Sequence, residues 1–248
     1  MQLWSRSTVR LDQRLVAEGL AESRTRARAL IAAGVVRLDG RVVSKPSAAA
    51  PLGLGVALTG DPLPWVSRAA LKLLHALDHF NLAPRGVALD LGASTGGFTE
   101  VLLARGAAHV HALDVGHGQM HPRIAADPRV TLHEGVNARA IPAGLLPRID
   151  WVTADLSFIS LEKALPSALD FAVPGAGLVA LVKPQFEAGP EAVGKGGVVR
   201  DQAVRDAAAT RVADGLDRCG WQVTGLTDSP ITGQGGNQEA LIAAYRRG

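Results

Sequence analysis

The chain has 248 residues, of which 47% are apolar and 20% charged, and its formal net charge is +3. This composition is typical of a folded protein with a sizeable core, and it excludes disordered and fibrous classes. The single cysteine, Cys219, excludes an intramolecular disulfide, and the first residues lack the apolar stretch of a signal peptide. The most apolar run, residues 171–182, is too short to span a bilayer. We therefore expect a cytoplasmic protein with no membrane anchor.

Positive charge is concentrated near the N-terminus. Residues 1–48 contain nine Lys or Arg against four Asp or Glu, whereas the remainder contains 17 against 19. Arginine at this density suits phosphate groups, so nucleic acid is the first candidate partner. A solvated face on a small domain would explain the charge equally well. The candidate RNA contacts are Arg6, Arg10, Arg14, Arg24, Arg26, Arg28, Arg37, Arg41 and Lys45.

Residues 10–46 predict two short helices followed by a hairpin. An apolar stripe at helical spacing ends at Gly19, and Ser23 is a suitable cap for a second helix that ends at Gly34. The dipeptide Asp39-Gly40 between two short apolar strands favours a two-residue hairpin turn. The segment resembles the S4-type RNA-binding domain, in which a helix pair and a hairpin present a basic surface to RNA. The resemblance implies a small α+β RNA-binding domain over residues 1–46.

A change of pattern follows this segment. Residues 47–64 are rich in Ala, Gly and Pro with one charge, Asp61, which predicts an interdomain linker. From residue 65 to 248 the pattern is α/β, and alternating helices and strands indicate a parallel, doubly wound sheet. A helix near 67–80 precedes strands near 87–91, 109–114, 130–133, 150–154 and 178–183. The last two strands, near 221–227 and 239–245, have no helix between them, which predicts one antiparallel strand as in Rossmann-like methyltransferases.

The ends of successive predicted strands carry a pattern that favours S-adenosylmethionine as cofactor. A glycine loop after the first strand lets a ligand approach the main chain at a helix N-terminus. Asp114 ends the next strand, where a carboxylate can bind both ribose hydroxyls, and Asn137 follows the third strand, where its amide can read an adenine edge. Dinucleotide sites of the GxGxxG type compete, although the spacing of Gly92 and Gly96 fits them poorly. The candidate cofactor residues are Asp90, Gly92, Ser94, Gly96, Gly97, Phe98, Asp114, Asn137 and Asp155.

Four residues far apart in the sequence are the candidate catalytic group: Lys72, Asp155, Lys183 and Glu239. Because the carboxyl ends of parallel strands meet in one crevice, Asp155 and Lys183 can reach a common ligand. A lysine accepts a proton only when uncharged, and burial near a second ammonium favours the uncharged amine. The group could thus deprotonate a hydroxyl. Taken without their surroundings, the same four residues would more readily be two surface ion pairs.

The motifs around these residues carry a second resemblance. In chain order they are SRAALKL, DLGASTGGFTEVLL, ALDVGHGQ, EGVNAR, DLSFISL, LVKPQFEAG and GGNQEALI. Together they resemble the TlyA family of ribosomal-RNA ribose 2′-O-methyltransferases, some of which are called hemolysin A, with an FtsJ-like catalytic domain. The resemblance implies a K-D-K-E tetrad of Lys72, Asp155, Lys183 and Glu239, S-adenosylmethionine as methyl donor, and a ribose of ribosomal RNA, of cytidine in particular, as acceptor. The expected partner is ribosomal RNA or a ribosomal subunit, with no obligate protein partner.

Other functions remain open at the level of sequence. A non-catalytic RNA-binding or ribosome-assembly factor would keep the folds without turnover, and a pore-forming hemolysin would need a membrane-inserting segment. Base methylation would need a cysteine nucleophile or an Asn/Asp-Pro-Pro-aromatic motif, and neither is present. The pairs His75/His79 and His117/His121 have helical spacing but lack completing ligands, so we expect no metal. We expect the Gly-rich segment 188–197 to cover an entering nucleotide.

Overall fold

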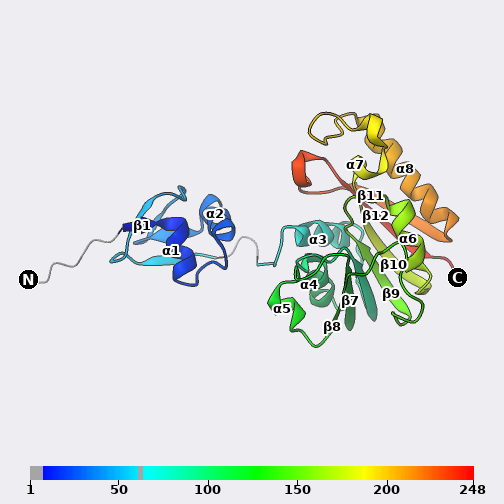
Figure 1. The fold of residues 1–248 in the computed structure, drawn as a ribbon, viewed down its shortest axis with the longest axis horizontal. Helices are drawn as coiled ribbons and strands as arrows, with labels where there is room; N and C mark the ends of the chain where they lie inside the picture. Colours follow the sequence, from blue (N-terminus) through cyan, green and yellow to red (C-terminus); the bar gives the residue numbers. More distant parts are fainter. Residues whose placement is uncertain (1–7, 61–63) are drawn as a thin grey trace, which may run out of the picture. The chain divides into compact units, whose positions relative to one another are not determined.

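The computed structural model describes residues 8–60 and 64–248, and the chain divides into two compact units, Met1–Pro64 and Trp65–Gly248 (Figure 1). The described part of the first unit has one apolar cluster, and the second unit has three. Because each unit buries its own apolar residues, each has the hydrophobic core that defines a separate domain.

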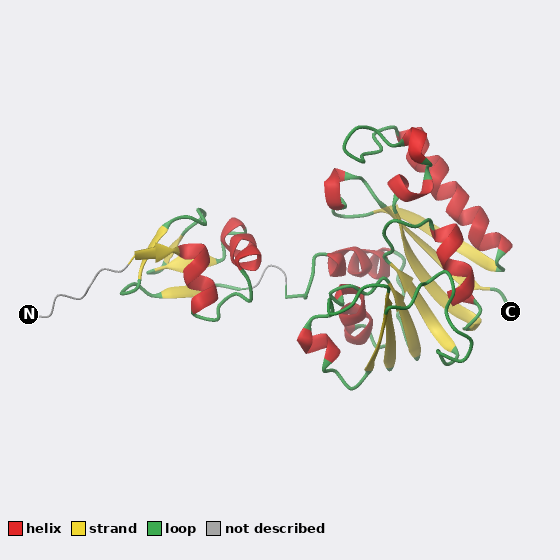
Figure 2. Ribbon diagram, in the orientation of Figure 1, coloured by secondary structure: helices red, strands yellow, loops and turns green. Residues whose placement is uncertain are grey.

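The N-terminal unit packs two helices against short strands (Figure 2). Its core contains Leu15 of the first helix together with Leu30 and Ile31 of the second. The hydroxyl of Ser23 accepts a hydrogen bond from the main-chain N of Arg26 at 3.1 Å, so the predicted helix cap is confirmed. The elements are β1 (Thr8–Arg10), α1 (Leu11–Ala17), α2 (Arg24–Ala32), β2 (Val36–Leu38), β3 (Arg41–Val42), β4 (Ala49–Pro51) and β5 (Val56–Leu58).

The expected linker over residues 47–64 is wrong for most of its length. Strand β4 pairs antiparallel with β1, and β5 pairs antiparallel with β2, so both belong to the N-terminal unit. Ala50 is fully buried in the core of this unit. The Pro and Gly content suggested a linker, but short edge strands also tolerate proline. The pairing of β4 and β5 depends on strands that are distant in the sequence, so the local pattern did not show it. The N-terminal unit therefore extends well beyond residue 46.

The second unit is a seven-stranded sheet with helices on both faces (Figures 1 and 2). The strand order is β11-β12-β10-β9-β6-β7-β8. The strands are β6 (Val87–Leu91), β7 (His109–Asp114), β8 (Val130–Glu134), β9 (Ile149–Ala154), β10 (Ala172–Val182), β11 (Trp221–Asp228) and β12 (Ala240–Arg246). The helices are α3 (Ala69–His79), α4 (Gly97–Ala104), α5 (Pro122–Ala125), α6 (Leu161–Leu169), α7 (Pro184–Glu187) and α8 (Gln202–Arg218), with 3-10 turns at Pro190–Ala192 and Gln234–Gly236.

The sheet confirms the predicted parallel arrangement with one antiparallel strand. Strands β10, β9, β6, β7 and β8 pair in parallel, and β12 runs antiparallel between β10 and β11. Apolar residues of α3 and α4 pack on one face, whereas those of α6 and α8 pack on the other. With both faces covered, the central strands are apolar almost throughout, and polar side chains collect at their carboxyl ends.

Candidate active site

Three cavities open at the carboxyl ends of the parallel strands. The largest, about 610 Å³, is lined by Gly92, Ser94, Asp114, Asn137 and Asp155, and we call it the glycine-loop cavity. A second, about 450 Å³, is lined by all four candidate catalytic residues, and we call it the tetrad cavity. A third, about 370 Å³, shares Lys72, Gly92, Asp155 and Lys183 with the other two. Asp155 lines all three cavities, so it stands where they meet.

The glycine loop is shaped by close contacts between neighbouring segments. Gly92 has φ of +77°, and a Cβ there would lie 2.7 Å from the main-chain oxygen of Asp155. A Cβ on Gly97 would lie 2.2 Å from Oγ of Ser67. Because a main-chain oxygen cannot rotate away, a side chain at Gly92 would displace the loop from the strand end, whereas a side chain at Gly97 would first displace the side chain of Ser67. The glycines therefore fix where the loop meets the cavity.

Asp114 links this loop to the end of β7. Its Oδ2 accepts a hydrogen bond from the main-chain N of Ser94 at 2.8 Å, and its Oδ1 accepts one from the main-chain N of Gly116 at 2.7 Å. Each carboxylate oxygen keeps a further lone pair for a ligand hydroxyl. Next to it, Val115 exposes 68% of its surface and lines the same cavity, where its apolar side chain suits the face of a purine ring.

Asn137 lies across the same cavity. Its Oδ1 accepts the main-chain N–H of Arg139 at 3.0 Å, which turns the loop after β8. An Asn side chain carries two amide donors in addition to this carbonyl. The predicted positions of Asp114 and Asn137 therefore fall in one cavity, at the ends of neighbouring strands.

Three predicted cofactor residues depart from the expected arrangement: Asp90 and Gly96 line none of the three cavities, and Phe98 lines only the third. Asp90 is fully buried and its carboxylate accepts hydrogen bonds from the hydroxyls of Thr99, at 2.7 Å, and Thr153, at 3.0 Å. Burial raises its pKa to about 6, while these two donors lower it. Phe98 is 2% exposed and packs in the core, although it is one of the residues that line the third cavity. Asp90 thus joins β6 to Thr99 of α4 and Thr153 of β9.

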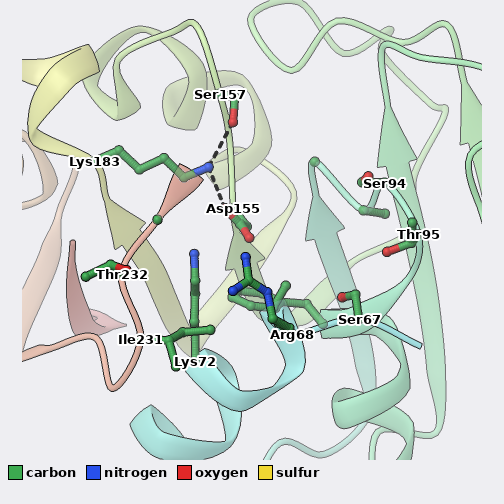
Figure 3. Close-up of a pocket in the computed structure, with 16 residues that line it drawn as sticks. Ser67, Arg68, Lys72, Ser94, Thr95, Asp155, Ser157, Lys183, Ile231 and Thr232 are labelled. Atoms are coloured by element: carbon green, nitrogen blue, oxygen red, sulfur yellow. Dashed lines mark hydrogen bonds and ion pairs between the residues drawn. The ribbon is translucent and has the colours of Figure 1, made fainter. Parts of the chain in front are cut away.

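The four candidate catalytic residues form two ion pairs. The Nζ of Lys183 lies 2.6 Å from Oδ1 of Asp155, and the Nζ of Lys72 lies 2.5 Å from Oε2 of Glu239. Figure 3 shows Lys72 reaching toward the cavity from α3 and Lys183 from the end of β10. Lys72 and Lys183 are each 8% exposed and Glu239 is 3% exposed, so the alternative of surface ion pairs does not hold. Buried charges in a cavity are typical of a site that acts on a ligand.

One residue of the site, Ser157, and one residue near it, Glu187, escaped the sequence analysis. The hydroxyl of Ser157 accepts a hydrogen bond from Lys183 Nζ at 2.9 Å (Figure 3). The carboxylate of Glu187 accepts the main-chain N–H of Leu161 at 2.8 Å and so joins the segment after Lys183 to the start of α6. Burial raises the pKa of Glu187 to about 7. Ser157 stands two residues after Asp155, and that proximity was the available signal.

The Gly-rich segment lies beside the tetrad cavity. Gly196 and Gly197 line this cavity together with Asn237. The buried Asn237 side chain accepts the main-chain N–H of Val199 at 2.9 Å and donates to the main-chain oxygen of Gly197 at 2.8 Å. One amide thus joins the Gly-rich segment to the loop that precedes Glu239.

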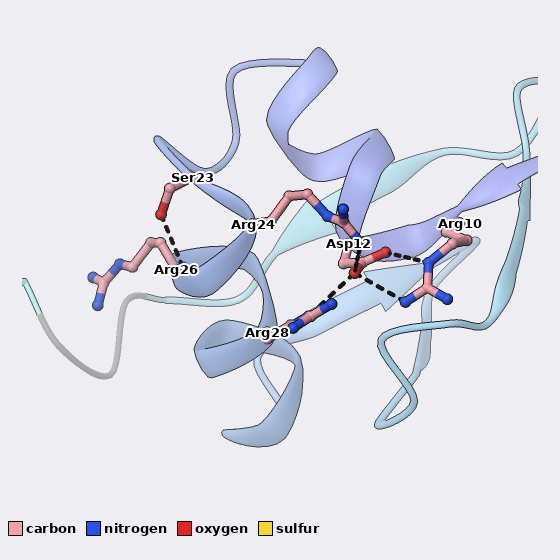
Figure 4. A network of polar contacts seen from close by, with 6 residues as sticks. All are labelled: Arg10, Asp12, Ser23, Arg24, Arg26 and Arg28. Carbon is pink, nitrogen blue, oxygen red and sulfur yellow. Dashed lines mark hydrogen bonds and ion pairs between the residues drawn. The ribbon is translucent and has the colours of Figure 1, made fainter.

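In the N-terminal unit, three of the predicted RNA contacts surround one carboxylate. Arg10, Arg24 and Arg28 each donate to Asp12, at 3.0 to 3.3 Å (Figure 4). Hydrogen bonds from Arg10 first, then from the other two, hold the pKa of Asp12 far below its usual range. The Asp12 side chain is inaccessible, whereas the three guanidinium groups are about half exposed. Asp12 therefore holds three arginines together at the surface.

The remaining predicted RNA contacts differ in how accessible they are. Arg14 is a correction: it is 4% exposed and donates to the main-chain oxygens of Pro51 and Leu54, both at 2.6 Å. Its guanidinium satisfies carbonyl groups inside the unit. Arg41 and Lys45 are exposed, as an RNA contact requires, and Arg26 and Arg37 are half-buried. Arg6 lies outside the described residues.

The glycine-loop cavity fits S-adenosylmethionine. Its volume of about 610 Å³ is in the range of a nucleoside-sized ligand, and it combines an acid at a strand end, an exposed apolar side chain and an amide. This fold with this site defines the class of S-adenosylmethionine-dependent methyltransferases with a Rossmann-like sheet. The FtsJ-like methyltransferase family model matches residues 65–246, and the S4 domain model matches residues 9–52.

Similarity to individual proteins shows which family of methyltransferases the chain belongs to. The chain is 48% identical over 236 residues to the 16S/23S rRNA (cytidine-2′-O)-methyltransferase TlyA of Mycobacterium tuberculosis, covering 94% of this chain and 88% of that one. It is 36% identical to Hemolysin A of Brachyspira hyodysenteriae, covering 94% and 98%. The solved structure of a putative hemolysin from Streptococcus thermophilus superposes with a TM-score of 0.74 at 38% identity, covering 98% and 90%. The chain belongs to the TlyA family of FtsJ-like methyltransferases.

The hemolysin names raise the question of membrane insertion. Among the helices within residues 8–60 and 64–248, none combines the length and the apolar character that crossing a membrane requires.

Proposed function

We propose that this methyltransferase transfers a methyl group from S-adenosylmethionine to the 2′-hydroxyl of a cytidine ribose in ribosomal RNA. The observation that carries the proposal is the convergence of Lys72, Asp155, Lys183 and Glu239 on one cavity beside the glycine-loop cavity. The name of the M. tuberculosis relative, a 16S/23S rRNA (cytidine-2′-O)-methyltransferase, supports this target. Because ribosomal RNA is the substrate, we assign the protein to the cytoplasm.

The glycine-loop cavity is the place for the methyl donor. Asp114 would bind the ribose hydroxyls, the Asn137 amide would bind the adenine edge, and the loop at residues 92–97 would hold the methionine end. Asp90 acts indirectly, because it fixes Thr99 and Thr153 beneath the loop. S-Adenosylmethionine supplies a methyl group already activated by a sulfonium, so the chain's tasks are positioning and removal of a proton.

Lys183 is the proposed base for the ribose hydroxyl. Its Nζ has one acidic neighbour, Asp155 at 2.6 Å, and one hydroxyl neighbour, Ser157 at 2.9 Å. A proton on the amine can pass to Asp155 along this short contact, which leaves a lone pair on Nζ for the substrate hydroxyl. Ser157 fixes the direction of the amine.

Lys72 and Glu239 are proposed to position the nucleotide. Their contact of 2.5 Å joins α3 to the start of β12, so each side chain holds the other in the cavity wall. The ammonium of Lys72 can donate to an oxygen of the ribose or phosphate, because its three N–H groups serve one carboxylate, that of Glu239, among the described residues.

The N-terminal unit is proposed to supply affinity for RNA. Arg10, Arg24 and Arg28 present a fixed cluster of guanidinium groups, and Arg41 and Lys45 add exposed charge. Such contacts bind phosphates and weaken as salt rises.

The base role of Lys183 is tested by two substitutions. Lys183→Ala removes the amine, and Lys183→Arg keeps a cation but cannot release its proton near neutral pH. We expect both to lower the single-turnover rate by about 10²- to 10⁴-fold, with the affinity for S-adenosylmethionine within a few-fold of wild type. Substantial activity in Lys183→Arg would remove Lys183 from the base role and leave it as a source of charge.

A further inference from the structure

A fourth cavity, about 370 Å³, adjoins the tetrad cavity and has no part in the reaction described above. Phe158, Gln185 and Phe186 line both cavities and form the partition between them. Arg139 and Lys163 also line the fourth cavity, and neither lines the tetrad cavity; Arg139 lines the glycine-loop cavity as well, whereas Lys163 lines none of the other three. We call this space the flanking cavity.

The flanking cavity has a positive character. Arg139 and Lys163 are exposed, and in the described part of the chain neither side chain makes an ion pair. Glu162, which precedes Lys163 in the sequence, pairs with Arg218 at 2.9 Å, and the buried Glu187 accepts a main-chain N–H at the start of α6. None of the residues that line this cavity is acidic. Two unpaired cations at a cavity wall suit a phosphodiester group.

The partition offers aromatic surface. Phe158 is 91% exposed and has a positive φ of 66°, a conformation that costs free energy in any residue with a side chain. Its ring centroid lies 5.3 Å from that of Phe186. Phe186 is half-buried and presents the rest of its ring to the cavity that it lines. Phenyl groups next to cations are the combination on which bases of single-stranded RNA stack.

Gln185 adds an unused acceptor between the two cavities. Its Oε1 is buried and has no hydrogen-bond partner among the described residues. A buried acceptor without a partner is unfavourable, and a nucleobase amino group would satisfy it.

We propose that the flanking cavity is a second nucleotide subsite that holds the residue next to the target in the same RNA strand. Arg139 and Lys163 take the phosphate, Phe186 takes the base by stacking, and Gln185 accepts a hydrogen bond from it. Single-stranded RNA fits this arrangement because its bases are free to separate and stack on side chains. This inference rests on the proposed function, because it requires a target ribose in the tetrad cavity.

The test measures methylation of ribosomal subunits that lack the modification, with the full chain. Lys163→Glu is expected to raise KM for the subunit about fivefold or more, and Phe186→Leu about threefold, with unchanged affinity for S-adenosylmethionine. Lys163→Ala should reduce the slope of log KM against log salt by about 0.7 to 0.9. Arg85→Glu is the matched control, because exposed Arg85 precedes β6 at the opposite end of the sheet; it should change KM less than about twofold.

The outcomes separate the two proposals. If wild type methylates the subunit but Lys163→Glu behaves like Arg85→Glu, the flanking subsite is wrong and the proposed function stands. If wild type transfers no methyl group to ribosomal RNA, both are wrong. If Lys163→Glu also weakens the binding of S-adenosylmethionine, its effect on KM does not isolate the RNA contact. The slope of log KM against log salt for Lys163→Ala is then the deciding measurement, and a slope equal to that of wild type would contradict the flanking subsite.

Discussion

Substitution of Gly92 by alanine tests how the geometry of the glycine loop affects function, and the same substitution of Gly144 is its matched control. Both have positive φ, +77° and +79°, but a Cβ on Gly92 would lie 2.7 Å from the main-chain oxygen of Asp155, whereas one on Gly144 would meet no atom within 4 Å. Alanine at either position carries the left-handed penalty of about 1–2 kcal/mol. Only Gly92→Ala adds displacement of the segment that carries Asp155, which costs a further ~1–3 kcal/mol.

Thermal unfolding and titration with S-adenosylmethionine measure the two effects. With about 2–4 °C per kcal/mol for a domain of this size, Gly144→Ala should lower Tm by about 2–8 °C and Gly92→Ala by clearly more. Gly92→Ala should also weaken S-adenosylmethionine binding about tenfold or more, because the loop and Asp155 move together, while Gly144→Ala leaves it unchanged. Equal Tm and equal affinity in the two variants would refute the close-contact argument.

Three further predictions follow from buried charges. Asp12→Ala should release the arginines that it holds, and we expect weaker RNA binding in a filter assay with an intact methyltransferase unit; unchanged RNA affinity would contradict the role of Asp12. Arg14→Ala should lower the Tm of the N-terminal unit, because two main-chain oxygens lose their donor, whereas Arg41→Ala should weaken RNA binding without changing Tm. Glu187→Gln should be more stable than wild type at pH 8 by roughly 1–3 kcal/mol and show no gain at pH 4. Folding raises the pKa of the Glu187 carboxyl from 4.5 to about 7, so the folded state binds the proton more tightly than the unfolded state. The contribution of this carboxyl to stability therefore falls as the pH rises through this window. A pH-independent difference in urea unfolding would count against the raised pKa.

The sequence predicted the sheet well because its strands are apolar runs with polar residues at their carboxyl ends. The strand-end rule placed Asp114, Asp155 and Lys183 at one edge of the sheet, and that is where they lie. The same rule failed for Asp90, whose position inside strand β6 directs its carboxylate between Thr99 and Thr153 instead of into a cavity. The position of Asp90 near the end of the strand did not show that its face of the sheet is covered there, by α4, which carries Thr99.

Errors in the N-terminal unit have similar causes. Arg14 was grouped with surface arginines by charge, although it stands three residues after Leu11, on the apolar stripe of α1. That spacing indicates a buried position. Strands β4 and β5 were missed because each has only three residues and depends on pairing with strands far away in the sequence.

The most direct test of the central claim is transfer of labelled methyl from S-adenosylmethionine to isolated ribosomal subunits that lack the modification, followed by alkaline hydrolysis of the RNA. Hydrolysis needs a free 2′-hydroxyl, so a 2′-O-methyl group protects the adjoining phosphodiester bond. We predict label in alkali-resistant dinucleotides that contain cytidine. Label in mononucleotides would mean base methylation and would contradict the roles given to Lys183 and Asp155.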